Sequence, residues 1–573
     1  MKLAMGMGTG DLNPHWFHKP AFFMYVLALC YGLFFGWGRA LGSFDSTAAF
    51  GARFLSDPGP FLLIGRLVVF ACGVATVYVV YRLARRAFGS LEAGLAAGLV
   101  AAVLPSMVAS SQDIKSDIPC ALLIALSVYL YLGVRETDRL RPLVLAALVA
   151  GAAMGTHYYA LVLVPTYLVA ELLRSRQAVE RTERAVAWRE FALRAALVVG
   201  LFLMGFFVTS PYNFLDPTWM RADVQRVEKT FGLGPATAQP VEQYEADSGT
   251  EFEPGARAWG GAAGSFLRVL LSANCLGVLF ALLTGLGLVA LLVRRETRWY
   301  ALLVLLPTAI FFFFASTTEA YHAQPRHLNA IFPLLATLAW PGAMLLARLL
   351  PAPRRSRLHP PITPLVALGL VALAALPSVA RASAHDATIS RLDSRLAAYR
   401  WLVANVPHET RLLVDDYGPI LQPNAAALSR QQALLVHLPT APFTAHQALR
   451  LELLQRYPEK DGMNLDELGH QWWLPREKSD AALRSTPSDL DMGSPLVSRV
   501  PQSLAAYRAQ GIRYVVTNSE ARGRYFGQGK NSAGGFPSFV RFYQELSALP
   551  PVQTFDPATW NGKGPVIWVY ELR

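Results

Sequence analysis

The chain places four ionisable side chains just before its first long apolar stretch. Asp11, His15, His18 and Lys19 lie in the segment GDLNPHWFHKPAFFMYVLALC. A signal peptide would instead carry its basic residues at the extreme start and a small-residue cleavage site after the apolar run. Lys19, just before Pro20 at a helix start, is suited to act as a point charge for a phosphate, with snorkelling at a membrane interface as the alternative. His18 is the metal-ligand candidate of this segment.

A second group of charges lies in the short segment SSQDIKSDIPC, which supplies Asp113, Lys115 and Asp117 between two apolar runs. Ionisable groups at the mouth of a helical bundle are costly, so they are functional candidates by default. If a helix begins here, the four-residue spacing places both carboxylates on one side. The alternatives are that Asp117 only caps a helix that begins near Pro119 and that Asp113 is only solvated.

Further candidates are polar side chains inside or beside apolar runs. Arginines in such places suit an anionic group, and the other polar side chains suit the lining of an aqueous cavity. Anchoring at the membrane interface, or an aromatic belt, is the alternative for these residues. The anion candidates are Arg66 and Arg326, and the cavity candidates are Asp113, His157, Tyr158, Tyr321 and His322.

The composition of the chain indicates whether these residues belong to a soluble protein or to a membrane protein. Of 573 residues, 53% are hydrophobic and only 16% are charged, and the mean hydropathy is +0.31. A typical soluble domain has about 25% charged residues. The chain is therefore expected to be a polytopic α-helical membrane protein. Its four cysteines all lie in apolar segments without CxxC spacing, which indicates neither a disulfide framework nor a zinc site.

Apolar runs long enough to cross about 30 Å of hydrocarbon predict the membrane segments. The run at 142–173 is too long for one crossing and is interrupted by GTHYYA, so we expect two short helices there, which makes about ten crossings. The other runs lie at 61–81, 91–110, 118–134, 191–209, 266–293, 299–316, 328–350 and 362–380.

The net charge of +12 predicts topology rather than nucleic acid binding, because the arginines fall in short loops between apolar runs. Seventeen of the 49 residues in five of these loops are Lys or Arg, and the loops lie at 82–90, 135–141, 174–190, 294–298 and 351–361. By the positive-inside rule these loops are cytoplasmic, and Asp117, Arg326 and everything after Arg381 lie on the outer side. The helix at 20–37 either spans, with Lys19 cytoplasmic, or lies along the interface, with Lys19 on the side of Asp117.

A change in hydropathy after Arg381 predicts a separate domain. The segment SRLDSRLAAYRWLVANV has helical periodicity, while RLLVDD, IRYVVTN and VIWVYELR are typical of short strands. We therefore expect an α/β domain at 381–573, after an outer-face motif at 1–19 and a transmembrane domain at 20–380.

The pattern of segments resembles glycosyltransferase family 39 of the GT-C superfold, which includes protein O-mannosyltransferases and aminoarabinose transferases that modify lipid A. The resemblance covers about residues 9–380. It rests on GDLNPHWFHKPAFFMYVLALCYGLFFGWG, IGRLVVFACGVATVYVVYRLARRAFG, SSQDIKSDIP, TSPYNFLDP and YHAQPRHLNAIFPLL.

The resemblance implies transfer of a sugar from a polyprenyl-phosphate carrier to a protein, lipid or glycan acceptor at the outer face. It implies that Lys19 contacts the lipid phosphate, helped by Arg66 or Arg326, and that Asp117 is the acidic residue of the next outer loop. His18 stands where some members have a metal-contacting glutamate, so a divalent metal ion is an open alternative, and no other cofactor is expected.

One departure from the family concerns the catalytic carboxylate. Family members begin with a transmembrane helix and an outer Asp-Glu pair, whose aspartate is the expected base, and this chain begins after that point. Either the start codon has been assigned too far downstream or the protein lacks that base. Asp117 is then the best surviving carboxylate, in an assisting role.

Two other functions compete with the transferase. A non-catalytic remnant would bind polyprenyl phosphate and present the C-terminal domain to a partner. A transporter of a lipid-linked sugar would predict broken helices, ionisable groups at the bilayer midplane and inverted repeats, which are not evident. The high Ala, Arg and Leu content suggests a GC-rich bacterial genome, which implies an undecaprenyl-type carrier, the inner membrane and an extracytoplasmic C-terminal domain.

Overall fold

The structure is a computed structural model. It describes residues 1–17, 19–137, 139–179, 184–217, 261–294, 296–317, 324–350, 362–435, 442–458, 461–469, 500–526 and 536–572. The chain forms two compact units, and each is described by itself. The first comprises Met1–Tyr31, Phe61–Val224 and Arg257–His385, and the second comprises Gly32–Pro60, Gln225–Ala256 and Asp386–Arg573, as far as these ranges are described.

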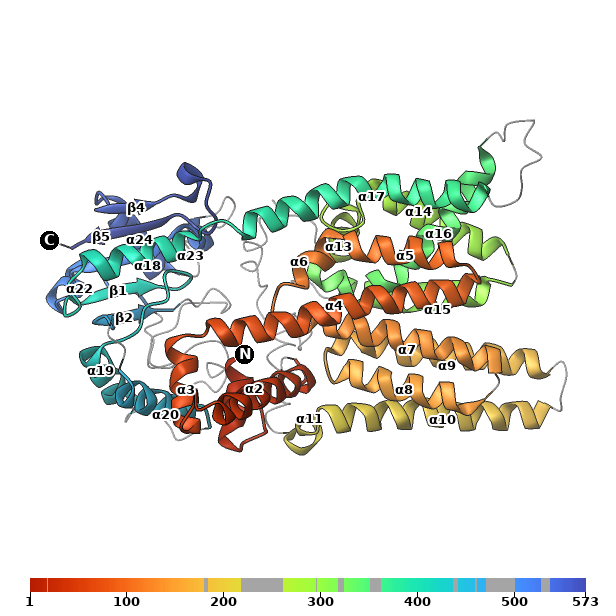
Figure 1. Cartoon of the computed structure of the whole chain (residues 1–573), viewed down its shortest axis with the longest axis horizontal. Coiled ribbons are helices and arrows are strands. Elements are labelled where there is room, and N and C mark those ends of the chain that lie inside the picture. Colours follow the sequence, from red (N-terminus) through yellow and green to blue (C-terminus); the bar gives the residue numbers. More distant parts are fainter. Residues whose placement is uncertain are drawn as a thin grey trace. The chain divides into compact units, whose positions relative to one another are not determined.

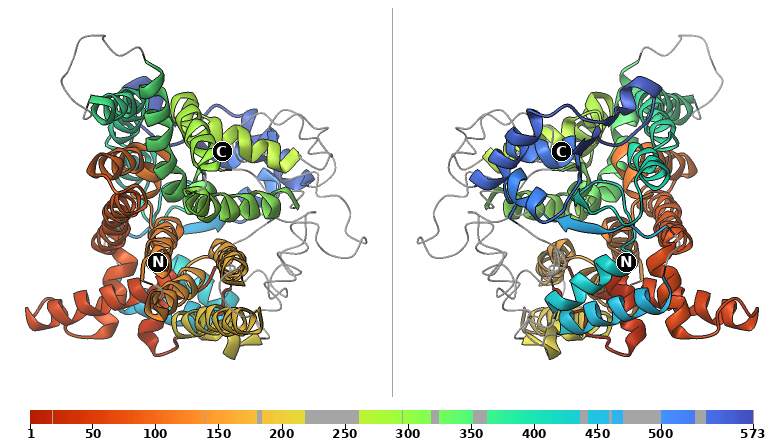
Figure 2. Two further views of the ribbon diagram at one scale, coloured as in Figure 1. Left: turned by 90° about the vertical axis from the view of Figure 1, so that its right-hand side faces the viewer. Right: turned by 90° about the vertical axis from the view of Figure 1, so that its left-hand side faces the viewer.

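The first unit is built of helices that run alongside one another (Figure 1), and Figure 2 shows many of them end-on. Its helices, some of which continue into the second unit, are α1 (Lys2–Gly6), η1 (Met7–Thr9), α2 (Phe22–Ala40), α4 (Gly59–Phe88), α5 (Leu91–Val103), α6 (Pro105–Ser110), α7 (Asp117–Thr137), α8 (Leu140–Met154), η2 (Tyr158–Val162), α9 (Leu163–Val179), α10 (Arg184–Thr209), α11 (Tyr212–Leu215), α13 (Gly261–Leu271), α14 (Gly277–Val293), α15 (Arg298–Thr317), η3 (Pro325–Ala330), α16 (Phe332–Leu349) and α17 (Ile362–Ile389).

Helix length and composition confirm an integral membrane protein. Among the described residues, six helices are long and apolar enough to cross a membrane: α2, α4, α7, α10, α16 and α17. Four shorter apolar helices lie at Leu91–Val103, Leu140–Met154, Gly277–Val293 and Arg298–Phe313. On α4 the side chains of Leu63, Leu67 and Phe70 are exposed, as expected for a surface that faces lipid.

Pairs of glycines let two pairs of helices pack in backbone contact. A Cβ on Gly287 of α14 would overlap the carbonyl oxygen of Leu338 on α16, and a Cβ on Gly342 would overlap that of Leu283 in return. Gly151 of α8 and Gly205 of α10 meet in the same way. Small residues of this kind drive helix association in lipid, where burial of apolar surface gives no advantage.

The predicted runs are interrupted at three points. The 142–173 run breaks between α8 and α9, where Thr156 and His157 leave the helix, as the two-helix interpretation requires. The prediction of single runs at 91–110 and 266–293 is wrong. Leu104 precedes Pro105 and takes an extended conformation, which ends α5. Gly277 has φ +66, a left-handed conformation that separates α13 from α14.

The second unit contains a five-stranded sheet in the order β2-β1-β3-β5-β4. The strands β1 (Leu412–Asp415), β2 (Leu465–Leu468) and β3 (Tyr514–Asn518) are parallel, and β4 (Gln553–Phe555) and β5 (Ile567–Glu571) complete the sheet in antiparallel pairing. Its helices are α3 (Thr47–Ser56), α18 (Ser394–Asn405), α19 (Ala425–Leu435), α20 (Pro442–Arg456), α22 (Leu504–Ala509), α23 (Ser519–Phe526), α24 (Pro537–Ser547) and η6 (Pro557–Trp560).

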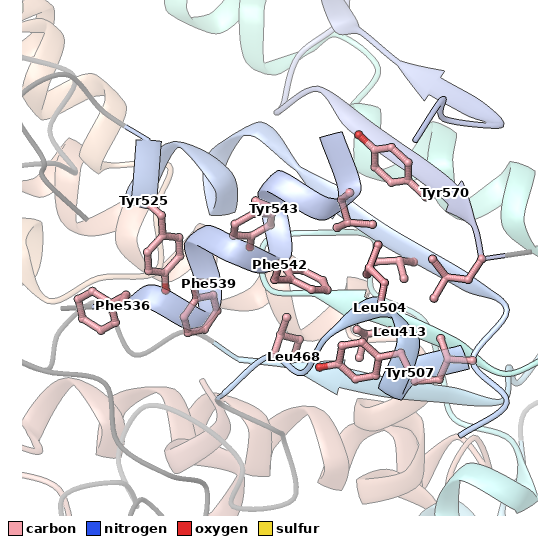
Figure 3. Packing of buried hydrophobic residues seen from close by; sticks show 14 residues of the cluster. Leu413, Leu468, Leu504, Tyr507, Tyr525, Phe536, Phe539, Phe542, Tyr543 and Tyr570 are labelled. Atoms are coloured by element: carbon pink, nitrogen blue, oxygen red, sulfur yellow. The ribbon is translucent and has the colours of Figure 1, made fainter. Parts of the chain in front are cut away.

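Helices cover both faces of this sheet, which confirms the expected α/β domain. Alternate residues of β1 point to opposite faces, so Leu413 packs with the aromatic side chains of α24 (Figure 3) while Leu412 packs against α18. At the end of β1, the carboxylate of Asp415 accepts hydrogen bonds from Thr517 and Tyr543, each at 2.7 Å. Burial, together with Asp415, raises the pKa of Tyr543, so its hydroxyl stays protonated and donates.

The second unit includes a part of the chain that lies far from it in sequence. Gln422 donates a hydrogen bond to the carbonyl oxygen of Leu55 at 2.7 Å, and the Leu55 side chain packs on the cluster of Leu428, Leu451 and Leu454. Residues 32–60 therefore group with the C-terminal residues. The domain limits expected from the sequence, at 19 and 380, stay a prediction, and the two compact units divide the chain differently.

The glycine contact between α14 and α16 predicts a position-specific effect on stability. Gly287→Ala should destabilise the protein by about 1–3 kcal/mol, because the added methyl group forces two backbones apart. Gly285→Ala is the matched control, since a Cβ at Gly285 in the same helix meets nothing within 4 Å. Thermal unfolding in one detergent compares them, and equal melting temperatures for the two variants would contradict the contact.

Candidate functional site

Lys19 and Asp117, which lie 98 positions apart in sequence, meet in the first unit. The Nζ atom of Lys19 is 3.8 Å from Oδ2 of Asp117, whose side chain is only 3% exposed. The two residues therefore lie at the same end of the first unit, as the interfacial placement of the opening helix predicts. The distance is longer than that of a hydrogen-bonded ion pair, which is about 2.7–2.9 Å.

Asp117 is held at this place by the start of α7. It is the first residue of the helix, where the helix dipole favours a negative charge. Because α7 begins only at Asp117, the expectation that Asp113 and Asp117 share a helical face is wrong. Asp113 lies before the helix, is exposed, and forms an ion pair with Lys115 at 2.9 Å.

The buried carboxylate leaves one oxygen available. Among the described residues, Oδ2 of Asp117 and the neighbouring Oγ of Ser116 are buried without a hydrogen-bond partner. A hydroxyl oxygen about 2.8 Å from both Nζ of Lys19 and Oδ2 of Asp117 fits the 3.8 Å separation. Such a hydroxyl would accept from the lysine and donate to the carboxylate.

Arg326 reaches this end of the unit on η3, which hydrogen bonds anchor to α6. Asn329 of η3 accepts from Oγ of Ser106 and donates to Oγ of Ser110, both at 2.8 Å and buried. Arg326 lies against His327, with Nε and Nε2 3.5 Å apart. These bonds hold η3 against α6.

The electrostatic balance around Lys19 favours an added anion. Burial lowers the pKa of the Lys19 ammonium, Asp117 raises it in part, and the charges of Arg326 and Lys115 lower it again. Because folding makes this proton harder to hold, burial of the ammonium opposes folding at neutral pH, and this cost falls as pH rises from the lowered pKa toward the ordinary pKa of lysine. Among the described residues, the charges of Arg326 and Lys115 therefore act on Lys19 alongside the carboxylate of Asp117.

Two of the predicted cavity residues, His157 and Tyr158, form hydrogen bonds with backbone groups. The ring of His157 accepts from the backbone N–H of Tyr159 at 3.4 Å, caps η2, and stacks on the Tyr159 ring at 3.8 Å. The hydroxyl of Tyr158 donates to the carbonyl oxygen of Phe17 at 2.7 Å. Tyr158 therefore contacts the segment that carries Lys19, and a role of either residue in lining a cavity stays a prediction.

Of the remaining candidates, Arg66 alone lies among the described residues. Arg66 is exposed on α4, and among the described residues no hydrogen bond or ion pair connects it to that pair. His18, Tyr321 and His322 lie outside the described residues. In the described part of the chain there is no group of three or more His, Cys, Asp or Glu residues that could hold a metal ion.

Sequence reasoning missed three buried residues that build this end of the unit: Ser210, Asn213 and Asn329. They are uncharged, so no desolvation argument singled them out. A signal was present for two of them, because Ser210 and Asn213 flank Pro211 immediately after a long apolar helix. Asn329 follows a similar helix-starting proline.

A family comparison bears on the segment that contains Asp117. Residues 62–204 match the model of a family described as dolichyl-phosphate-mannose-protein mannosyltransferase. The family resemblance is confirmed over this segment. This segment contains most of α4, α5 to α9 and most of α10, and thus Asp117 at the start of α7.

Two solved structures are similar to the chain along most of its length. They are crystal structures of ArnT from Cupriavidus metallidurans, one in the apo state and one bound to undecaprenyl phosphate. Each is 14% identical to this chain, and each match covers 99% of this chain and 92% of the other, with TM-scores of 0.46 and 0.47. No curated protein sequence matches the chain.

The Lys19–Asp117 geometry predicts energetic coupling between the two side chains. Lys19→Met should lower stability by about 1–3 kcal/mol, because it leaves a buried carboxylate without its counter-ion. Adding Asp117→Asn should restore most of that loss, since the buried charge is then gone. Melting temperatures of the two single variants and the double variant measure the coupling.

The exposed ion pair of Lys115 and Asp113 supplies the control for this cycle. Lys115→Met should change stability by about 1 kcal/mol or less, as exposed pairs usually do. If the losses of Lys19→Met and Asp117→Asn simply add in the double variant, the two side chains are not coupled and the described geometry is wrong.

Proposed function

We propose that the protein is a membrane glycosyltransferase that moves a sugar from a polyprenyl-phosphate carrier to an acceptor at the outer face of the membrane. The observation that carries the proposal is the partly buried Lys19 ammonium, which among the described residues has one carboxylate beside it, Asp117 at 3.8 Å, while the charges of Arg326 and Lys115 also act on it. A phosphate group would add negative charge there. The match of residues 62–204 to a family named for a lipid-phosphate sugar donor supports the same substrate class.

In this proposal the Lys19 ammonium binds the phosphate of the donor. When the bond between the anomeric carbon and the phosphate oxygen breaks, its electron pair stays on the phosphate, and negative charge builds up there. A fixed ammonium in a site largely shielded from water stabilises that charge strongly. Arg326, whose charge already acts on Lys19, supplies the second cation, while the exposed Arg66 is the less suitable of the two arginines.

Asp117 takes the proton of the acceptor in the same step. Its Oδ2 is buried without a hydrogen bond and can accept one from an acceptor hydroxyl. As the hydroxyl oxygen bonds to the anomeric carbon, its proton passes to the carboxylate, and the phosphate leaves from the opposite side. Direct displacement of this kind inverts the configuration at the anomeric carbon.

Removal of the Lys19 charge tests the proposed donor contact. Lys19→Ala should reduce sugar transfer by about 100-fold or more, because a charge positioned at the leaving group is lost. Lys2→Ala, which removes an exposed lysine at the start of α1, should leave the rate unchanged. The assay measures transfer from a purified polyprenyl-phosphate sugar by the folded protein in detergent, and equal rates for Lys19→Ala and wild type would overturn the role.

The pH dependence of transfer is a separate test. Because the pKa of Lys19 is lowered, its ammonium is lost at a lower pH than that of an ordinary lysine, and transfer should fall as pH rises through that value. Lys19→Arg should retain some activity and shift the fall to higher pH, since arginine stays charged. An alkaline limb at the same pH in both proteins would show that another group controls it.

A further inference from the structure

A ring of hydrogen bonds closes around the turn that carries Lys19. It connects the backbone at Phe17, before the turn, with the backbone at Ala21, after it, through three side chains from distant parts of the chain. These side chains are Tyr158, Asn213 and Ser210, in the segments GTHYYA and TSPYNFLDP. The proposed transfer chemistry uses none of the three.

One half of the ring holds the start of the turn. The hydroxyl of Tyr158 donates to the carbonyl oxygen of Phe17 at 2.7 Å. Nδ2 of Asn213 in turn donates to the hydroxyl oxygen of Tyr158 at 2.9 Å. Phe17 is only 3% exposed and Asn213 only 4%, so this half of the ring lies between largely buried residues.

The other half holds the end of the turn. The backbone N–H of Ala21 donates to Oγ of Ser210 at 2.8 Å, and Ser210 donates to Oδ1 of Asn213 at 2.5 Å. Every member therefore donates in the same direction around the ring, from Ala21 to Phe17. Bonds arranged head to tail in a buried site polarise and strengthen one another.

The ring is built on the closely packed pair of helices α8 and α10. Ser210 directly follows α10, and the backbone N–H of Phe22 donates to the carbonyl oxygen of Gly155, which directly follows α8, at 2.9 Å. Gly155 itself packs so closely on Thr209 that a Cβ would overlap its hydroxyl. The turn is thus attached to the part of the unit where two backbones touch.

Lys19 needs such an attachment because its own ammonium is loosely held. Among the described residues its side chain makes one ion pair, to Asp117 at 3.8 Å, and a lysine side chain has several rotatable bonds. A displacement of about 1 Å at a reacting group can cost about 100-fold in rate. The ammonium can be placed that accurately only if the backbone of the turn is fixed.

We propose that Tyr158, Ser210 and Asn213 are positioning residues that place the Lys19 ammonium for an anionic phosphate. The inference rests on the proposed function of Lys19. It assigns a role to the two segments that the transfer chemistry leaves unused. A purely structural role would make the same residues matter for stability without any specific effect on phosphate binding.

Binding of undecaprenyl phosphate to the purified full-length protein tests the proposal. Tyr158→Phe and Ser210→Ala each remove one hydroxyl from the ring, and each should weaken binding about 10-fold at a temperature where all variants are folded. The double variant should bind undecaprenyl phosphate about as weakly as the weaker-binding single variant, because one broken hydrogen bond already opens the ring. Ser127→Ala is the control.

Ser127 is a matched control because it is also a fully buried hydroxyl with two bonds. It donates to the carbonyl oxygen of Ala146 at 2.7 Å and lies 2.6 Å from the hydroxyl of Tyr167. Ser127→Ala removes this hydroxyl from α7. It should lower the melting temperature about as much as Ser210→Ala does, without changing the affinity for undecaprenyl phosphate. A similar loss of affinity in Ser127→Ala would show that the effect is general destabilisation.

A cycle with Lys19→Ala separates the positioning role from the proposed function. If the ring acts through Lys19, then Tyr158→Phe should weaken binding in the wild-type background and have no further effect in the Lys19→Ala background. If wild type and Lys19→Ala bind equally, the proposed function and the positioning role are both overturned. If Lys19→Ala loses affinity while Tyr158→Phe and Ser210→Ala bind like wild type, the positioning role alone is wrong.

Discussion

A buried ammonium must be compensated by negative charge, and this requirement governs the Lys19 end of the first unit. The carboxylate of Asp117 compensates Lys19 only in part, because it is 3.8 Å away and Arg326 and Lys115 add positive charge. Replacing a buried ion pair by apolar residues of similar volume is often neutral or stabilising. In the proposed function, the phosphate of the donor supplies the missing negative charge.

The rest of the first unit can be understood as the support for that arrangement. Glycine contacts bring α8 against α10, and Gly155 and Ser210, which directly follow these helices, bond to the backbone just after Lys19. Buried hydrogen bonds from Asn329 attach η3 to α6 and thereby place Arg326. The charged groups lie in turns, in short helical segments or at a helix start, but hydrogen bonds attach these segments to rigid helices.

Much of the fold could be predicted from the sequence, because lipid requires long apolar helices and a sheet covered on both faces requires apolar strands. The strands β1, β3 and β5 were recognisable for this reason. The strand β2 was not, since Asp466 and Glu467 interrupt its apolar pattern, and β4 has only three residues. The breaks at Leu104 and Gly277 were missed because hydropathy does not register a change in backbone conformation within an apolar run.

The sequence by itself determined the membrane environment, the two kinds of architecture, and the choice of Lys19, Asp117 and Arg326 as candidates, since charges beside apolar runs stand out by their cost. Only the tertiary structure decided that these three come together. It alone connected Ser210 to Ala21 across 189 residues. A neutral hydroxyl or amide has no distinctive cost in sequence, and its importance depends on the partner that folding brings within hydrogen-bonding distance.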